Sequence, residues 1–118
     1  MGYLTTHVLD AAHGCPGEGI KVSLFRLQND QSREQIQQVL TNADGRCDQP
    51  ILDAEAFRKG TYELVFEVGE YFRKRGVELP EPAFLEEVVL RFGIADEAEH
   101  YHVPLLVSPY SYSTYRGS

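Results

Sequence analysis

The sequence has little positive charge, and this limits the partners that it can have. It contains 11 lysine and arginine residues against 18 aspartate and glutamate residues, which gives a formal net charge of -7. A nucleic-acid-binding surface needs basic side chains clustered on one face. The one local group is Arg73, Lys74 and Arg75, and three such charges are typical of a solvated helix end. We therefore expect no nucleic acid as a partner.

Long hydrophobic runs are also missing. No apolar stretch approaches the ~18 residues that a membrane-spanning helix requires. The opening segment MGYLTTHVLDAAHG lacks the basic and apolar regions of a signal peptide. We therefore expect a cytoplasmic protein that does not enter a membrane.

Cysteine is scarce, and several familiar catalytic motifs are absent. Cys15 and Cys47 are the two cysteines, and they form no close pair in the sequence, so neither a disulfide framework nor a cysteine-based zinc site is expected. The chain has no glycine-rich phosphate loop and no Gly-x-Ser-x-Gly motif. Any chemistry has to come from other side chains.

The sequence does contain many short strand patterns separated by turns. The clearest begins at Tyr62 and ends at Val68, where alternating apolar side chains predict a half-buried strand. Basic residues at the end of the segment 69–75, followed by Gly76, predict one short helix. Further strands are expected at residues 4–9, 20–27, 34–41, 84–92, 100–107 and 111–116. With no repeat or linker, we expect one domain over residues 1–118, an all-β, two-sheet antiparallel sandwich of eight strands with one short helix.

Two histidines near the C-terminus share one face of an expected strand. His100 and His102 are two residues apart, so their side chains point the same way. This spacing can hold a metal ion, but a metal site needs at least one more ligand and none is close in the sequence. The other face is apolar and is expected to pack on the core, so His102 should lie outside; the core set is Tyr101, Val103, Leu105 and Val107. An outer face with histidine and leucine predicts that something covers it.

Residues elsewhere have side chains suited to chemistry, although their pattern leaves the role open. His7 lies on the first expected strand, either as a solvated residue or as part of a site. Arg46 follows a turn of the Asp-Gly type, which is expected to place it at the start of a strand. It is either a surface charge or a clamp for a substrate or an oxyanion, because a guanidinium group offers a planar fork of donors. On the last strand, Ser111, Ser113 and Tyr115 share a face.

The C-terminal sequence SPYSYSTYRGS closely resembles the signature of the 5-hydroxyisourate hydrolases, the transthyretin-like protein family. The segments LTTHVLDAAHGCPG, NADGRC, GTYELVFEVGEYF and HYHVPLLVSP are similar to the family's first strand and turn, Asp-Gly-Arg turn, strand-to-helix segment and penultimate strand. The resemblance therefore covers nearly the whole chain in the same order. Transthyretin, the hormone carrier of the family, shares SPYSYST but lacks the terminal YRGS and the histidines.

This resemblance implies a fold, an activity and an assembly. The fold would be the transthyretin-like (prealbumin-like) sandwich. The activity would be hydrolysis of 5-hydroxyisourate to 2-oxo-4-hydroxy-4-carboxy-5-ureidoimidazoline in urate (purine) degradation, with no metal and no cofactor. The assembly would be a homotetramer, a dimer of dimers with active sites in the channel between the dimers. Matched by motif, the catalytic residues fall on His7, Arg46 and His102, and the substrate-binding residues on Ser113, Tyr115, Arg116 and Ser118.

The implied mechanism divides the work among these side chains. His7 and His102 would share the activation of water and the delivery of a proton, while Arg46 would orient the substrate and stabilise negative charge. Tyr115 would contact the substrate ring. The division of roles between the two histidines stays open, as does the role of the terminal carboxylate of Ser118. Two alternatives remain: a carrier that binds a small aromatic ligand in the channel, and a structural or partner-binding sandwich whose histidines are incidental.

Overall fold

Strands account for most of the regular structure between residues 2 and 117, the part of the chain that the computed structural model describes. This range contains nine strands, one α-helix and one 3₁₀-helix. The strands are β1 (Tyr3–Asp10), β2 (Cys15–Pro16), β3 (Lys21–Leu27), β4 (Arg33–Leu40), β5 (Leu52–Asp53), β6 (Gly60–Phe66), β7 (Val88–Ile94), β8 (His100–Ser108) and β9 (Ser111–Thr114). The helices are η1 (Ala54–Ala56) and α1 (Val68–Lys74).

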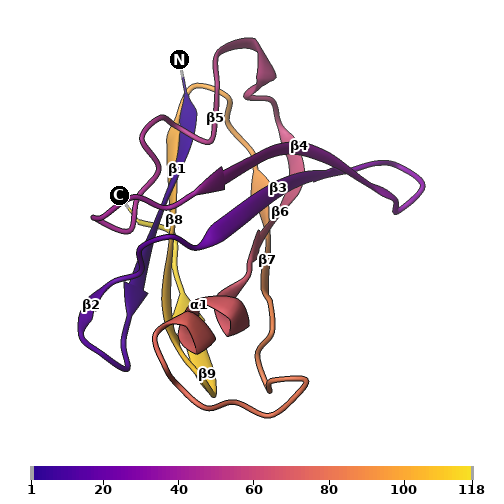
Figure 1. Cartoon of the computed structure of the whole chain (residues 1–118). Helices are drawn as coiled ribbons and strands as arrows, with labels where there is room; N and C mark the ends of the chain where they lie inside the picture. The colour runs from indigo at the N-terminus through magenta and orange to yellow at the C-terminus, as the bar shows by residue number, and fades with distance from the viewer. Residues whose placement is uncertain (1, 118) are drawn as a thin grey trace.

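The strands form two sheets (Figure 1). One has the order β2-β1-β8-β9, with β5 also paired to β1, and the other has the order β4-β3-β6-β7. This arrangement confirms the expected two-sheet sandwich. The expected strand count was eight; the described residues hold nine, of which β2 and β5 are pairings of only two residues each.

One strand pair departs from the antiparallel rule. β1 and β8 run parallel, with Tyr3 opposite His100 and Asp10 opposite Val107. All other strand pairs in the described range are antiparallel. A parallel pair needs a long crossover connection, and here the whole second sheet lies between β1 and β8 in the sequence. Residue alternation along a strand contains no information on the direction of its partner, so this pairing was not predicted.

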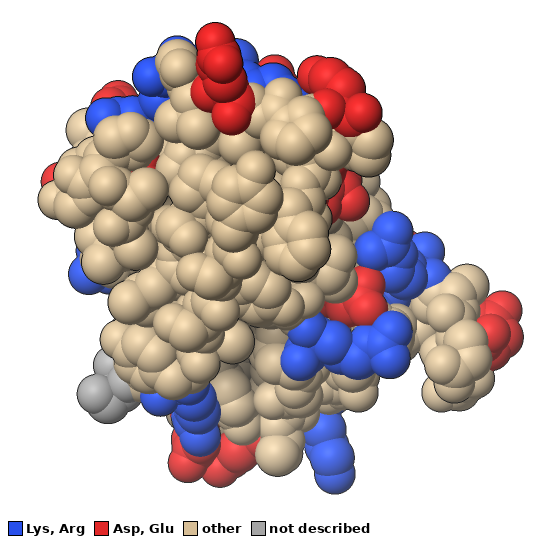
Figure 2. Space-filling model, turned by 90° about the horizontal axis from the view of Figure 1, so that it is seen from below, with Lys and Arg blue, Asp and Glu red and all other residues tan. Residues whose placement is uncertain are grey.

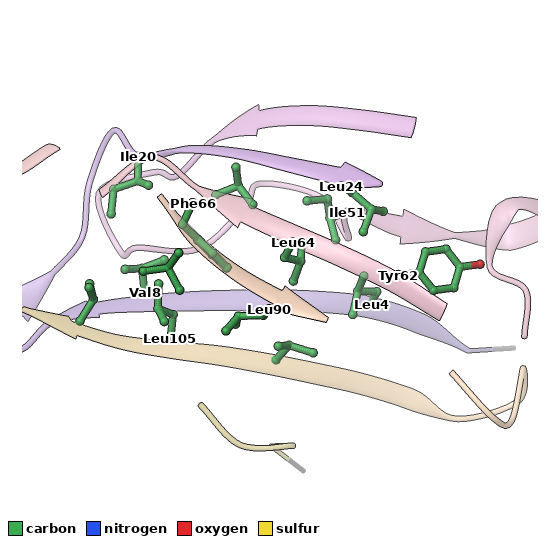
Figure 3. Close-up of a cluster of buried hydrophobic side chains, with 14 of the residues drawn as sticks. Leu4, Val8, Ile20, Leu24, Ile51, Tyr62, Leu64, Phe66, Leu90 and Leu105 are labelled. Carbon is green, nitrogen blue, oxygen red and sulfur yellow. The ribbon is translucent and has the colours of Figure 1, made fainter. Parts of the chain in front are cut away.

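The core fills the space between the two sheets (Figure 3). Leu4 and Val8 of β1 point into it together with Leu64 and Phe66 of β6, and all four are fully buried. The inward face expected for β8 is confirmed, because Tyr101, Val103, Leu105 and Val107 are all buried. The odd-numbered side chains of β8 therefore form the core, and the even-numbered histidines lie on the other face.

The expectation of a half-buried β6 was wrong. Glu63 and Val65, on its outer face, are only 5% and 6% exposed. Arg33 of β4 and Arg91 of β7 extend over this face and each donates a hydrogen bond of 2.9 Å to the Glu63 carboxylate. Long arginine stems cover apolar surface while their charged groups stay near water. The outer face of β6 is therefore covered at Glu63 by side chains from other strands of the same sheet.

Two strand boundaries also differ from the sequence-based expectation. The strand expected from residue 84 starts at Val88, because Glu86 folds back to accept hydrogen bonds from the Ala83 amide and from Arg73, which holds residues 84–87 in a turn. The last strand ends at Thr114 rather than at residue 116. The helix forms as expected, shifted by one residue. No helix between residues 2 and 117 is long and apolar enough to cross a membrane.

Candidate active site

The candidate site lies on the outer face of the paired strands β1 and β8. Inward and outward residues alternate along β1, so Thr5 and His7 are half-buried while their neighbours are buried. The parallel register sets Thr5 opposite His102 and His7 opposite Pro104. Two adjacent strands thus carry His7 and His102 on one surface, as the alternation in the sequence predicted for each strand separately.

A tight turn brings Arg46 to the same surface. The Asn42 carbonyl accepts a hydrogen bond from the Gly45 amide at 2.9 Å, and the Asn42 side chain accepts one from the Arg46 amide at 3.1 Å. Gly45 has a φ of 76°, a left-handed conformation that glycine adopts without strain. The Gly45 carbonyl accepts a hydrogen bond of 2.8 Å from the Val8 amide. The turn is therefore fastened directly to β1.

The sequence-based prediction that Arg46 starts a strand was wrong, because the turn does not continue into one. Arg46 instead forms an isolated antiparallel bridge with His7. A Cβ atom on Gly45 would lie 2.4 Å from the carbonyl oxygen of Val8, a separation that two such atoms cannot adopt. Glycine is the residue that allows this close approach, and the approach places Arg46 beside His7.

An open hollow of about 320 Å³ lies at this place. His102, on β8, is half-buried and lines the hollow. Arg46, at the end of the turn, also lines it and is exposed. The full lining is Tyr3, Thr5, Thr6, Arg46, Cys47, Gln49, His100 and His102. A hollow with a cation and an imidazole at its surface suits a small polar or anionic ligand.

The electrostatics keep the histidines neutral. Burial lowers the pKa of His7, and the nearby charge of Arg46 lowers it further, while Asp44 acts in the opposite direction. Burial also lowers the pKa of His102, with further contributions from Arg46, His100 and His7. An imidazole can accept a proton only in its neutral form. Both histidines are therefore suited to act as bases near neutral pH.

The C-terminal segment packs directly on His102. The Gly117 amide donates a hydrogen bond of 2.7 Å to the carbonyl oxygen of His102, and the two residues form an isolated bridge. A Cβ atom on Gly117 would lie 2.6 Å from Cδ2 of the His102 ring. The glycine of the YRGS motif therefore gives the imidazole the space that it occupies.

The predicted substrate-binding residues are not all at the hollow. Ser113 pairs with Leu106 and so shares the outer face with His102, but farther along β8. Tyr115 and Arg116 line a different groove, of about 420 Å³, between β7 and the β8–β9 pair. The Arg116 guanidinium lies 4.0 Å above the Tyr101 ring. Ser118 lies outside the described residues.

His100 and Thr5 also line the hollow, although neither was predicted as a catalytic or substrate-binding residue. His100 stacks on Tyr3 with ring centroids 4.1 Å apart. Thr5 contacts the rings of both His100 and His102. Alternation along β1 places Thr5 on the outer face. Its contact with the two histidines depends on the parallel register of β1 and β8, which the sequence did not reveal. Between residues 2 and 117 there is no cluster of three or more His, Cys, Asp or Glu side chains arranged to hold a metal ion.

The sequence and the structure are similar to those of known proteins. The HIUase/Transthyretin family profile matches residues 4–117. The 5-hydroxyisourate hydrolase of Pseudomonas aeruginosa is 69% identical over 118 residues, which cover 100% of this chain and 93% of that protein. The solved structure of Klebsiella pneumoniae 5-hydroxyisourate hydrolase is 36% identical and has a TM-score of 0.81, with 100% of both chains covered. Sea bream transthyretin, solved in complex with thyroxine, is 25% identical with a TM-score of 0.86, over 97% of this chain and 93% of that one. This protein therefore belongs to the HIUase/Transthyretin family.

Proposed function

We propose that this protein hydrolyses 5-hydroxyisourate to 2-oxo-4-hydroxy-4-carboxy-5-ureidoimidazoline, a step in the breakdown of urate, and that residues 1–118 act as one hydrolase domain. The observation that supports this most strongly is the position of Arg46, which pairs with His7 and lines one hollow with His102. The relatives named 5-hydroxyisourate hydrolase support the same substrate. We propose a cytoplasmic location, which cell fractionation would test.

The reaction opens the six-membered ring of the substrate. Water attacks a ring carbonyl carbon, a C–O bond forms, and the bond from that carbon to the ring nitrogen breaks. The attacking water loses a proton and the departing nitrogen gains one, so a neutral imidazole can take the first and return the second. His7 and His102 share these two transfers. Their lowered pKa values, caused by burial and by Arg46, favour the neutral form that the first step needs.

Arg46 acts on the charge that develops during the attack. The carbonyl oxygen becomes an oxyanion in the transition state, and a fixed cation beside it lowers the barrier. The turn that holds Arg46 is fastened to β1 through the Gly45–Val8 hydrogen bond, which fixes the backbone from which the guanidinium extends. The reaction as written requires no metal and no cofactor.

We further propose a homotetramer, a dimer of dimers with its sites in the channel between dimers. Large apolar side chains remain exposed on the single chain, with Phe84 at 71% and Tyr110 and Tyr115 at 60% each. Seen from below, the molecule has a broad area without charged side chains, and the charges lie mostly around its margin (Figure 2). Exposed apolar side chains and an uncharged surface support this proposal, because large exposed apolar patches mark association surfaces. Sedimentation velocity tests the assembly, and a fully active monomer would contradict it.

The predicted substrate contacts remain part of this proposal. Ser113 lies on the channel-facing surface, and Tyr115, Arg116 and Ser118 follow it in the chain. Substitution of Ser113 by alanine is expected to raise KM. An unchanged KM would remove Ser113 from the set of substrate contacts.

The activity itself can be tested with freshly prepared substrate. Urate oxidase converts urate to 5-hydroxyisourate, whose ultraviolet absorbance is then followed with and without this protein in water enriched in ¹⁸O. We expect faster decay and one labelled oxygen in the new carboxylate of the product. If decay is not accelerated but thyroxine binds, the carrier interpretation replaces the hydrolase; the thyroxine complex of the sea bream relative makes this the second candidate.

A further inference from the structure

The hydroxyl of Thr5 lies between two imidazole rings. Its Oγ1 atom is 2.8 Å from Nε2 of His100 and 2.7 Å from Nδ1 of His102, and both distances are typical of hydrogen bonds. The parallel register of β1 and β8 produces this arrangement, because it sets Thr5 opposite His102 and Tyr3 opposite His100. The stack of Tyr3 on His100 then fixes the second ring.

A hydroxyl group has one hydrogen, and this restricts the protons of both rings. Thr5 can donate to only one ring nitrogen, so its oxygen has to accept a hydrogen from the other ring if both contacts are hydrogen bonds. Two arrangements satisfy this condition. In the first, His102 carries its hydrogen on Nδ1 and Thr5 donates to His100. In the second, His100 donates to Thr5, and Thr5 donates to Nδ1 of His102.

The first arrangement is the one that a base at His102 requires. It leaves the lone pair on Nε2, the ring nitrogen that does not contact Thr5. Within residues 2–117, Nε2 of His102 has no hydrogen-bond partner, whereas Nδ1 is held at 2.7 Å. The adjacent Cδ2 atom lies against Gly117. The free nitrogen is thus held in place by a hydrogen bond on one side of the ring and by packing on the other.

We propose that Thr5 and His100 are positioning residues that hold His102 with Nε2 free and relay a proton away from it during the reaction. When Nε2 takes a proton from the attacking water, the Nδ1 hydrogen of His102 passes to the Thr5 oxygen, and the Thr5 hydrogen passes to Nε2 of His100. The reverse shift occurs as Nε2 of His102 gives its proton to the departing nitrogen. No proton is gained or lost over the cycle. This role rests on the proposed hydrolase function.

The charges around His102 favour a transfer away from it. Arg46 lines the same hollow, and its backbone forms a bridge with that of His7. Burial, Arg46 and the other histidines all lower the pKa of His102, so a positive charge there is disfavoured. Asp44 acts on His7 in the opposite direction to Arg46. Cys47, which also lines the hollow, is half-buried, and burial together with Asp48 raises the pKa of its thiol. It therefore supplies no negative charge near neutral pH.

His100 is a better place for the positive charge. The face of the Tyr3 ring lies against it, and an aromatic face attracts a cation. The carbonyl oxygen of His100 accepts a hydrogen bond of 3.2 Å from Arg116, whose own charge is paired with Glu99 at 2.9 Å. The transferred proton thus moves from a site beside Arg46 to one beside a π face and a paired arginine.

The test compares two substitutions of Thr5 in the full-length protein. Thr5→Val removes the hydroxyl while keeping the shape and the preference for a strand, and Thr5→Ser retains the hydroxyl. Imidazole ¹⁵N NMR on the resting protein identifies the tautomers of His100 and His102 without substrate. We expect hydrogen on Nδ1 of His102 in the unsubstituted protein and in Thr5→Ser, and a mixture of tautomers in Thr5→Val. For Thr5→Val we also expect kcat to fall ~10- to 100-fold with KM nearly unchanged, the range seen when hydrogen-bond partners that orient metal-ligating histidines are removed.

Two results would overturn the relay. One is a His102 that carries its hydrogen on Nε2 in the unsubstituted protein, which can be measured even if Thr5→Val does not fold. The other is a Thr5→Val protein with unchanged kcat. The NMR result does not depend on turnover. If the unsubstituted protein shows the expected tautomers but does not accelerate substrate decay, the hydrolase proposal fails and the hydrogen-bond assignment stands.

Discussion

Arg46 and His7 pair through their backbones in an antiparallel bridge, although one follows a turn and the other lies in the middle of β1. The bridge depends on Gly45, whose carbonyl oxygen accepts the Val8 amide hydrogen. Main-chain contacts thereby set the backbone of Arg46 beside that of His7. A cation within reach of the reacting carbonyl can stabilise the charge that develops there.

Replacing Gly45 by alanine should disrupt this pairing. Its Cβ atom would meet the Val8 oxygen at 2.4 Å, and its φ is 76°. Gly19 is a matched control because its φ is 78° and a Cβ atom there would meet nothing within 4 Å. We expect Gly19→Ala to lose about 1 kcal/mol of stability with little loss of activity, and Gly45→Ala to lose more stability and most of kcat/KM. Equal effects of the two substitutions on kcat/KM would show that the Gly45 contact does not position Arg46.

The charge of Arg46 should be visible in the pH dependence of activity. A lowered histidine pKa means that the neutral base persists below the usual value of ~6.5, so kcat/KM should fall only as the pH drops through the lowered pKa. Arg46→Met removes the charge, which lets the pKa values of His7 and His102 rise and moves the acid limb to higher pH. Arg46→Lys keeps the charge, so its acid limb should stay in place even if the rate falls. Identical acid limbs for Arg46→Met and Arg46→Lys would show that the charge of Arg46 does not lower the pKa of the catalytic histidine.

The packing of Gly117 on His102 makes the YRGS glycine sensitive to any side chain. In Gly117→Ala the new Cβ atom would lie 2.6 Å from Cδ2 of His102, so the ring or the segment has to move. Displacements of about 1 Å in a site can cost ~100-fold in rate. We therefore expect a large loss of kcat/KM with a nearly unchanged melting temperature. Gly93→Ala, where the closest atom to a Cβ would be 4.0 Å away, should retain activity, and an equally active Gly117→Ala would contradict the proposed contact.

Most of the fold followed from patterns that are local in sequence. The alternation in β8 correctly separated the core residues from His102, and the helix was displaced by one residue only. The outer face of β6 could not be predicted, because Glu63 is buried by Arg33 and Arg91, which come from other strands. Whether the outer face of a strand is buried depends on the side chains that neighbouring strands extend over it. The topology of the sheet decides which strands those are.

Candidate site residues were named from the sequence, but the contacts between them were not. His7, Arg46 and His102 followed from the resemblance, and the structure brings them to one surface. The bridge between Arg46 and His7 joins segments whose pairing has no local signature, and the Thr5 contacts depend on the parallel register of β1 and β8. Tyr115 and Arg116 lie at another groove of the single chain, and their role as substrate contacts stays a prediction.

Glu63 should make stability depend on pH. Burial alone would raise its pKa, but hydrogen bonds from Arg33 and Arg91 outweigh burial, and the pKa is lowered. The stabilisation is therefore present above the unfolded-state value of ~4.3 and is lost as the pH falls through the lower folded-state pKa. Glu63→Gln should cost about 1.5–3 kcal/mol at pH 7 and flatten this dependence. Urea unfolding at fixed protein concentration measures both effects.

The control for Glu63 is a pair on the surface. Glu70 lies 3.4 Å from Lys74, and both side chains are more than half exposed. Such pairs contribute little to stability, so Glu70→Gln should leave the free energy of unfolding and its pH dependence nearly unchanged. If the two glutamine variants behave alike, the buried pairing of Glu63 is not what stabilises the sheet.

The most direct measurement is the decay of freshly prepared 5-hydroxyisourate with the unsubstituted protein and with His102→Asn, at pH 7 and equal concentrations. The asparagine keeps a side chain that can hydrogen-bond but cannot act as a base. We expect the unsubstituted protein to accelerate the decay strongly and the variant to lose ~100-fold or more of that acceleration, with an unchanged melting temperature. No acceleration by the unsubstituted protein, or an undiminished rate in His102→Asn, would contradict a hydrolase that uses His102 as its base.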